Sequence, residues 1–430
     1  MYTRRIYAVE EEMRLANFND FNILHAGTQR HGAHLAKNYF GAMGLFSVNG
    51  FLFDPDNPDE ILPKVSDDKG SLEASTPEMS TASAAVQSLV DSRHILTDLF
   101  ALQEHYNLFL HQSTMTTYPS GTHLNLSTEA DLPSYARPMA LHQLSMPVLF
   151  GSGYYSRRDI QRGVDEGFCI SPKMMTLDKV QGSSDGDNGA EGVLFDTRRI
   201  SSDFKNMHIT STDTNRVDYM TWLKLVSSSL VMRLVEQTHG TAIDDGHLNL
   251  IDLDNNMLFE PYRQTHKLKN DDGRFADISV LRTPAIEIQR GLIESCKKLD
   301  DVTHEEEVGL RHWEELVRRS EEGDFEGTEW KARLDIVRET DDPWGVNLEV
   351  SDARVSRVAD LWSVRNPNLA IPKIVGPPTR SLGRLALLRA AFEGHVKIAE
   401  LGWEYDDRRT GKRRTRRTSH QDVHDPTPWI

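Results

Sequence analysis

The sequence predicts a protein of the α+β class, and two kinds of pattern carry the prediction. Over residues 217–236 apolar side chains recur at three- and four-residue steps, which is typical of a helix with one buried face. Shorter segments, such as 5–13 and 121–126, are typical of strands. The chain has 430 residues, of which 38% are hydrophobic and 27% charged, so it can bury a large core.

The composition disfavours several classes of protein. A net charge of -16 argues against nucleic acid and against a membrane surface as the main partner. Cys169 and Cys296 are the only cysteines and lie among apolar residues, so we expect reduced core thiols rather than a disulfide framework. The N-terminus lacks the apolar stretch of a signal peptide, and no run approaches 18 apolar residues. We therefore expect a cytoplasmic protein.

The first strand, 5–13, carries three consecutive glutamates. Because side chains alternate along a strand, Glu10 and Glu12 share one face and Glu11 points to the other. Two carboxylates on one face repel each other unless a cation lies between them, and Mg²⁺ prefers oxygen ligands. The alternative is a solvated acidic strand end.

The following elements are predicted from local patterns. Pro77 forces an extended segment that carries Glu73 and Glu78, two further candidate ligands or bases. In the strand 121–126, His123 and Asn125 share a face, although a single strand histidine is more often structural than a ligand. We expect helices over 34–46 and 84–106, strands over 51–53, 168–180 and 192–199, a surface loop over 54–70, and a linker over 182–189.

The stretch 208–236 is expected to form a strand, a polar turn and a long helix. Asn215 is the predicted N-cap, with Asp218 in the capping-box position. His208, Asp213 and Asn215 would then lie near a helix N-terminus, which suits anions. A capped core helix without a ligand is the alternative interpretation.

The second half is predicted to be mainly helical. We expect helices over 285–299, 304–323, from Glu329 onward, 351–364 and 380–392, with a proline-rich boundary at 372–378. A strand over 401–405 precedes 408–417, which holds seven basic residues around Gly411 and predicts a β-hairpin tip. That tip is either a docking patch for an acidic partner or a solvated basic turn.

Taken in order, these segments resemble the Pup ligase and Pup deamidase family. The opening RRIYAVEEE resembles the first strand of that family, and the stretch from Asn206 to Glu236 resembles its R-L-H-V-I-x-G-D-x-N segment and the helix after it. The match continues through LEASTPEMSTAS, SGTHLNL, FDTRR, PAIEIQR, the Glu329–Trp330 pair, PPTR and the final DPTP. The resemblance covers nearly the whole chain.

The resemblance implies a glutamine-synthetase-like fold, a curved antiparallel sheet backed by helices, over 1–350, and a small C-terminal domain over 351–430. It implies ATP and Mg²⁺ in the concave face of the sheet. The residues that it places at the metal are Glu10, Glu12, Glu78, His123 and His208. It places His123, Asn125, Arg198 and His208 near the nucleotide, and it gives Glu73 and Arg198 catalytic roles.

The departures from the family pattern fall mainly on substrate-side residues. Glu73 replaces the family's catalytic Asp, and the longer side chain displaces the carboxylate by roughly an ångström. The other departures are Thr76, Leu124, Asp196, Arg199, Ile200 and Asn206. We therefore expect the phosphoryl chemistry to persist while the donor, the acceptor or both have changed.

The resemblance implies an ATP- and Mg²⁺-dependent carboxylate–amine ligase. It would join the C-terminal Glu side chain of a Pup-like modifier or peptide to a lysine or amine through a glutamyl phosphate. Two alternatives stay open. One is a deamidase or isopeptidase that uses the same site, and the other is a catalytically silent nucleotide-binding homologue.

Overall fold

The computed structural model describes residues 5–17, 46–48, 51–53, 64–68, 71–101, 108–111, 121–128, 132–156, 167–177, 179–183, 193–199, 205–238, 275, 277–339, 396–399, 402–407 and 412–417. Everything below concerns these residues. Outside them lie the predicted helices over 351–364 and 380–392, the boundary at 372–378, most of the linker over 182–189, and all of the helix predicted over 34–46 except Phe46. Phe46 is the first residue of a strand, so the prediction is wrong at that residue. The division into domains at residue 350 stays a prediction.

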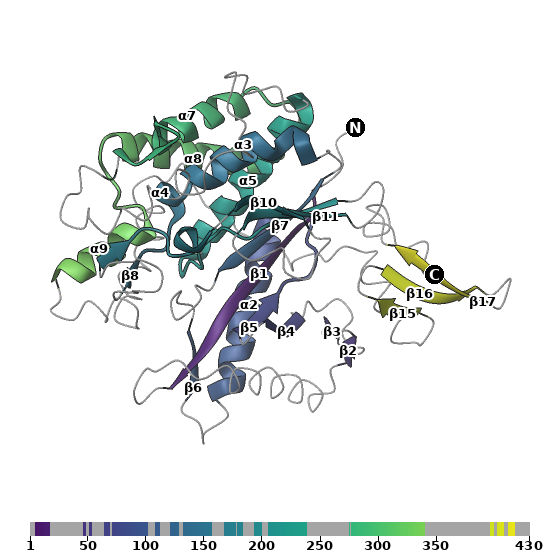
Figure 1. The fold of residues 1–430 in the computed structure, drawn as a ribbon. Coiled ribbons are helices and arrows are strands. Elements are labelled where there is room, and N and C mark those ends of the chain that lie inside the picture. The colour runs from purple at the N-terminus through teal and green to yellow at the C-terminus, as the bar shows by residue number, and fades with distance from the viewer. Residues whose placement is uncertain are drawn as a thin grey trace.

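A ten-stranded sheet is the largest sheet of the described structure (Figure 1). Its strands run in the order β10-β11-β12-β7-β1-β5-β4-β3-β2, and β6 pairs with β1. All the pairs are antiparallel except β10 with β11. The strands are β1 Tyr7–Asn17, β2 Phe46–Val48, β3 Phe51–Phe53, β4 Lys64–Asp68, β5 Ser71–Ser75, β6 Leu108–His111, β7 Thr122–Thr128, β10 Lys179–Ser183, β11 Val193–Arg199 and β12 Lys205–Ile209.

Helices cover one side of this sheet (Figure 1). The described helices are α2 Ala82–Ala101, α3 Leu132–Ser145, α4 Pro147–Phe150, α5 Asp218–Thr238, α7 Ala285–Cys296, α8 His304–Glu321 and α9 Glu329–Glu339. Helices α2, α3 and α5 contact strands of the large sheet, α7 and α8 pack on α5, and α9 lies beside the strand β8 Tyr154–Ser156. Helix α5 contacts β7 and the helices α2, α3, α7 and α8, so it lies at the centre of the helical layer. Its residues 219–235 are all buried, so the helix buries more than the single face that its apolar period predicted.

The core lies between the helices and the facing side of the sheet. Alternate strand residues enter it, for example Val9, Leu124, Leu126, Met207 and Ile209, which are all 0% exposed. The sequence-based strand and helix predictions for the described residues are confirmed, with two further corrections. Strand β4 lies within the segment expected to be a loop, because β3 and β5 pair with it on both sides. The strand expected over 168–180 is interrupted by a 3-10 helix, η1 Lys173–Thr176, directly after Pro172, which cannot donate a ladder hydrogen bond.

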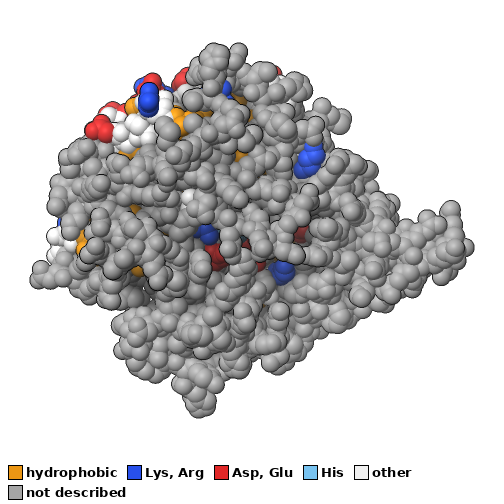
Figure 2. Space-filling model, viewed as in Figure 1, with side chains coloured by type: hydrophobic (Ala, Val, Ile, Leu, Met, Phe, Trp, Pro, Cys, Tyr) orange, Lys and Arg blue, Asp and Glu red, His pale blue; other side chains and the backbone are white. Residues whose placement is uncertain are grey.

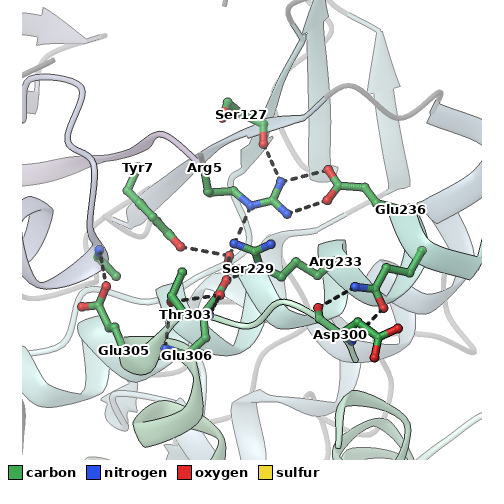
Figure 3. A network of polar contacts seen from close by, with 12 residues as sticks. Arg5, Tyr7, Ser127, Ser229, Arg233, Glu236, Asp300, Thr303, Glu305 and Glu306 are labelled. Atoms are coloured by element: carbon green, nitrogen blue, oxygen red, sulfur yellow. Dashed lines mark hydrogen bonds and ion pairs between the residues drawn. The ribbon is translucent and has the colours of Figure 1, made fainter. Parts of the chain in front are cut away.

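A buried polar network ties the start of the sheet to the helices (Figure 3). The guanidinium of Arg5 donates to both carboxylate oxygens of Glu236 on α5, at 3.0 and 2.7 Å, and its Nε donates to Ser229 Oγ at 3.2 Å. Ser229 donates to Glu306 on α8 at 3.0 Å, and Arg233 Nε donates to the same carboxylate at 2.6 Å. These charged hydrogen bonds fix the entry of β1 against α5 and α8.

Three smaller sheets complete the described structure. Strands β8 Tyr154–Ser156 and β9 Gly167–Cys169 form one pair, and β13 Ser279–Val280 and β14 Thr283–Pro284 form another. Strands β15 Val396–Ala399, β16 Gly402–Asp407 and β17 Lys412–Arg417 form an antiparallel sheet near the C-terminus. Strands β16 and β17 confirm a hairpin in this region, but residues 412–417, expected at its tip, are part of a paired strand. Residues 408–411 lie outside the described residues. No helix in the described part of the chain is long and apolar enough to cross a membrane.

Candidate functional site

The face of the large sheet that points away from the helices is polar. Residues directly opposite each other in an antiparallel pair share a face, and the register pairs Glu10 with His123, Asn125 with His208, and Glu12 with Glu73. Arg198 pairs with Asn206, which puts its position on the same face. The sheet thus brings nearly all the predicted site residues to one surface. Near the middle of the face seen in Figure 2, acidic and basic side chains lie together.

Three of the predicted residues form a tight group. One ligand atom each from Glu10, His123 and His208 lie within 4.8 Å of one another. His208 Nε2 is 3.2 Å from Glu10 Oε2, His123 Nδ1 is 3.6 Å from the same oxygen, and the two imidazole rings meet edge to face at 5.0 Å. Each side chain comes from a different neighbouring strand, so the group depends on the register of β12, β7 and β1.

The charges of this group stabilise one another. Burial opposes ionisation of Glu10, but His208 and His123 outweigh it and hold the pKa of that carboxyl well below its usual range. Burial likewise disfavours a charged His123, yet its contacts with Glu10 and Glu12 raise the pKa of the imidazole. The negative charge of Glu10 and the imidazoles of His123 and His208 thus favour each other's charged forms.

Glu12 lies beside this group and is held by two donors. Its Oε2 accepts the Gly121 N–H at 2.7 Å and lies 3.3 Å from Lys173 Nζ. Its Oε1 is 3.7 Å from His123 Nε2. Burial acts to raise the pKa of Glu12, but Lys173, His123 and the Gly121 N–H lower it, so this carboxylate is ionised at neutral pH.

Glu73 and Glu78 lie on the β5 side of the site. Glu73 is half-buried directly opposite Glu12, and Ser75 Oγ donates to its carboxylate at 3.4 Å. Glu78 precedes Met79, whose backbone pairs with Tyr7 through bonds of 2.9 and 2.8 Å. That pairing holds the Glu78 segment against β1. Neither residue belongs to the three-residue group found among the described residues.

Asn125 lies on the β12 side of the group. Its Oδ1 accepts from Asn206 Nδ2 at 2.6 Å. Its own Nδ2 is buried and has no hydrogen-bond partner in the part of the chain that the structure describes. A buried amide donor normally has an acceptor, so this group is suited to an oxygen-rich ligand.

The predicted capping of α5 is wrong in one respect. Asn215 does not cap the helix with its side-chain oxygen; its Nδ2 donates to Phe150 O at 3.2 Å and to Glu329 Oε2 at 3.0 Å. The carboxylate of Glu329, which is 0% exposed, instead accepts the Arg216 and Val217 N–H groups at 3.1 and 3.3 Å. The anion at this helix N-terminus is therefore the protein's own, because Glu329 and the α5 dipole satisfy each other.

Sequence reasoning missed Lys173 and Gly121 as site residues. Lys173 lies in a segment expected to be strand, where its side-chain direction could not be assigned. The sequence pattern identifies Gly121 only as the start of a predicted strand. Its contribution is a backbone N–H, which carries no signature in the sequence.

Comparison with known proteins identifies the family. The family described as Pup-ligase protein matches residues 65–365, well over half of the chain. The chain belongs to the Pup ligase family. The match confirms the predicted family and the prediction of a ligase enzyme. The sheet and helices described above confirm the predicted α+β class. No curated protein matches the sequence.

Two solved structures have similar folds. One is a complex between the prokaryotic ubiquitin-like protein Pup and its ligase PafA, which is 15% identical, with a TM-score of 0.62. The match covers 99% of this chain and 92% of that chain. The other is the Pup ligase PafA in complex with ADP, at 14% identity and a TM-score of 0.55, covering 91% of this chain and 92% of that chain. At these identities the likeness concerns the fold.

Proposed function

We propose that this protein uses ATP and Mg²⁺ to join a carboxylate of a Pup-like protein modifier or peptide to an amine, with protein lysines as acceptors. The observation that carries the proposal is the Glu10–His123–His208 group beside Glu12 and Glu73 on the polar face of the sheet. The PafA structures were solved with Pup in one case and ADP in the other. The match to the Pup ligase family over residues 65–365 supports the reaction class of the proposal.

The residues present fit a divalent cation. Glu10 and Glu12 supply carboxylate oxygens, which Mg²⁺ prefers, and His123 and His208 supply two imidazole nitrogens. The group has the compactness that a shared cation requires, since its ligand atoms lie within 4.8 Å. Glu78 is proposed as a further ligand from the β5 side. A bound cation would supply charge neutralisation for the nucleotide phosphates.

The remaining site residues would position and polarise the reactants. A donor carboxylate oxygen attacks the γ-phosphorus of ATP, and ADP leaves. The amine nitrogen then attacks the acyl carbon, and phosphate leaves as the isopeptide bond forms. Glu73 is proposed to accept the amine proton, and Arg198 to stabilise the charge on the transferring phosphoryl group. Asn125, with His123 and His208, would contact the nucleotide.

A hydrolase is the second candidate. Glu73, opposite Glu12 on the polar face, could activate a water molecule instead of an amine. Water would then cleave the side-chain amide or the isopeptide bond, giving the free carboxylate and ammonia or lysine without net ATP turnover. Product analysis separates the two candidates. A ligase releases ADP only when donor and amine are both present, whereas a deamidase or isopeptidase releases ammonia or lysine without stoichiometric ADP.

Calorimetric titration with ATP and Mg²⁺ tests the shared part of the proposal. The unmodified protein is expected to bind in the micromolar range, and Glu10→Gln and Arg198→Ala are expected to abolish this. Glu315→Gln, which removes a carboxylate from the exposed pair with Arg318, is the matched control and should bind normally. Absence of binding by the unmodified protein would contradict both enzymatic candidates. Tight ADP retention without turnover on any donor would instead indicate a silent homologue.

We also propose that β17 contributes to recognition of an acidic partner. The register pairs Arg413 with Asp406, so that basic position faces an acid, whereas Arg414 pairs with Tyr405 and Arg416 with Trp403. Alternation puts Arg414 and Arg416 on one face of the strand and Arg413 on the other. The face that carries Arg414 and Arg416 is therefore basic and aromatic, and it should bind an acidic chain better than the face on which Arg413 is paired with Asp406.

Two charge-reversed variants with the same net charge separate these faces. Arg414→Glu with Arg416→Glu should weaken binding of a fluorescein-labelled acidic peptide, measured by anisotropy at low salt. Arg413→Glu with Arg417→Glu should change it little. Equal effects of the two variants would show that only the net charge of β17 matters for binding. If neither variant changed the affinity, β17 would not be part of the binding surface.

A further inference from the structure

Lys224 and Asp213 form a buried pair outside the candidate site. Lys224 is 0% exposed on α5, and its Nζ donates to the Asp213 backbone carbonyl at 2.6 Å. Asp213 is 3% exposed, and its carboxylate accepts the backbone N–H groups of Lys173 at 2.9 Å and Ser152 at 3.2 Å. Burying an ammonium group costs free energy of folding, which suggests that Lys224 has a role beyond packing.

Asp213 is connected to both donors that hold Glu12. Its carboxylate fixes the backbone of Lys173, whose Nζ reaches Glu12. Its backbone forms an isolated bridge with Gly121, whose N–H donates to the same Glu12 oxygen. The neighbouring Thr122 N–H donates to the Thr212 carbonyl at 3.0 Å, which strengthens this junction.

The contact between Gly121 and Lys173 is close. A β-carbon at position 121 would lie 2.9 Å from both Cε and Nζ of Lys173 and 3.0 Å from the Thr212 carbonyl oxygen. The lysine side chain therefore passes directly over the glycine on its way to Glu12. The positions of the Gly121 N–H and the Lys173 ammonium therefore depend on the positions of residues 212 and 213.

We infer that Lys224 and Asp213 are positioning residues that orient the Glu12 carboxylate for cation and nucleotide binding. Lys224 anchors residue 213 from the helical layer, Asp213 fixes Gly121 and Lys173, and these two hold Glu12. The inference rests on the proposed nucleotide site. Neither Lys224 nor Asp213 need contact the nucleotide for this role.

Calorimetric titration with ATP and Mg²⁺ tests the inference in Lys224→Met, which keeps an unbranched side chain one atom shorter and removes the charge. Partners that orient metal ligands typically contribute 10- to 100-fold in affinity, so binding should weaken by at least about 10-fold. Arg233→Met is the matched control, because Arg233 is an equally buried cation on the same helix, paired with Glu306 at 2.6 Å. It should lose thermal stability without losing affinity.

A double-mutant cycle with Lys173→Met distinguishes positioning from general destabilisation. If Lys224 acts through Lys173 and Glu12, the combined variant should bind little more weakly than Lys173→Met alone. Asp213→Asn, nearly the same size, repeats the test if Lys224→Met does not fold. Unchanged affinity in a folded variant, or fully multiplicative losses in the cycle, would overturn the inference while leaving the proposed function intact. Failure of the unmodified protein to bind would refute the proposed function itself.

Discussion

Replacing Glu329 by Gln should be among the most destabilising single changes in the described structure. The Glu329 carboxylate is 0% exposed and accepts from Asn215, from the Arg216 and Val217 N–H groups, and from Arg333 Nη2 at 2.6 Å. An amide keeps the shape, but it turns an NH₂ toward donors and leaves the guanidinium of Arg333, 1% exposed, without its counter-charge.

The magnitude follows from these contacts. Removing one partner of a buried ion pair costs about 3–5 kcal/mol, and loss of charge at a helix N-terminus, worth up to about 2 kcal/mol, is part of that cost. With an m-value near 3 kcal/mol/M in urea, the unfolding midpoint should fall by roughly 1 M or more. Circular dichroism across a urea series measures it.

Two variants make this reasoning refutable. Glu315→Gln removes a carboxylate from a surface pair with Arg318, where the expected cost is below about 1 kcal/mol. Adding Arg333→Met to Glu329→Gln should recover part of the loss, because the uncompensated charge is gone. A Glu329→Gln variant that unfolds within about 1 kcal/mol of the unmodified protein would refute the assignment of Glu329 as the cap of α5.

Three further changes have defined outcomes. Burial, opposed by a hydrogen bond with Gln289, lowers the pKa of His142 to about 3, so this imidazole is protonated at a higher pH in the unfolded chain than in the folded protein. The free energy of unfolding should therefore fall by on the order of 4 kcal/mol as the pH falls from about 6.5 toward 3. In acid denaturation curves, His142→Gln should reduce this loss of stability. Gly121→Ala should displace the Lys173 side chain and weaken ATP–Mg²⁺ binding in calorimetry with little change in melting temperature; unchanged affinity would contradict the close contact. Arg282 has a φ of 69° at the tip of the β13–β14 hairpin, so Arg282→Gly should raise the free energy of unfolding by up to about 1 kcal/mol, and destabilisation would count against strain there.

The fold was predictable where local pattern and tertiary pairing agree. Helix α5 shows its period directly, and β1 and β7 are both visible as strands. Strand β4 was not predictable, because the sequence KVSDD has little apolar alternation and is a strand only through its neighbours. The break at η1 carried a signal in Pro172, but the surrounding apolar residues favoured a continuous strand.

The candidate site was predictable for side chains and not for backbone contacts. Strand alternation alone predicts that the side chains of Glu10 and Glu11 point to opposite faces of the sheet. The structure confirms this, because the Glu11 side chain is 0% exposed and pairs with Arg93 of the helical layer at 2.6 Å. The register between strands, which brings Glu10 to His123, cannot be read from one sequence. The contact of the Gly121 N–H with Glu12 cannot be predicted from the sequence either, because every residue type except proline carries a backbone N–H donor.

The same alternation explains why the departures from the family pattern leave the proposed cation ligands in place. Leu124 lies between His123 and Asn125, so it enters the core at 0% exposure and changes the packing rather than the polar face. Thr76 is buried and accepts the Val9 N–H through its hydroxyl at 2.9 Å, which is a structural contact. Asn206, by contrast, lies on the polar face and bonds Asn125. Of these three departures, only Asn206 can alter what the polar face binds, and it does so on the side of Asn125, away from Glu12 and Glu73.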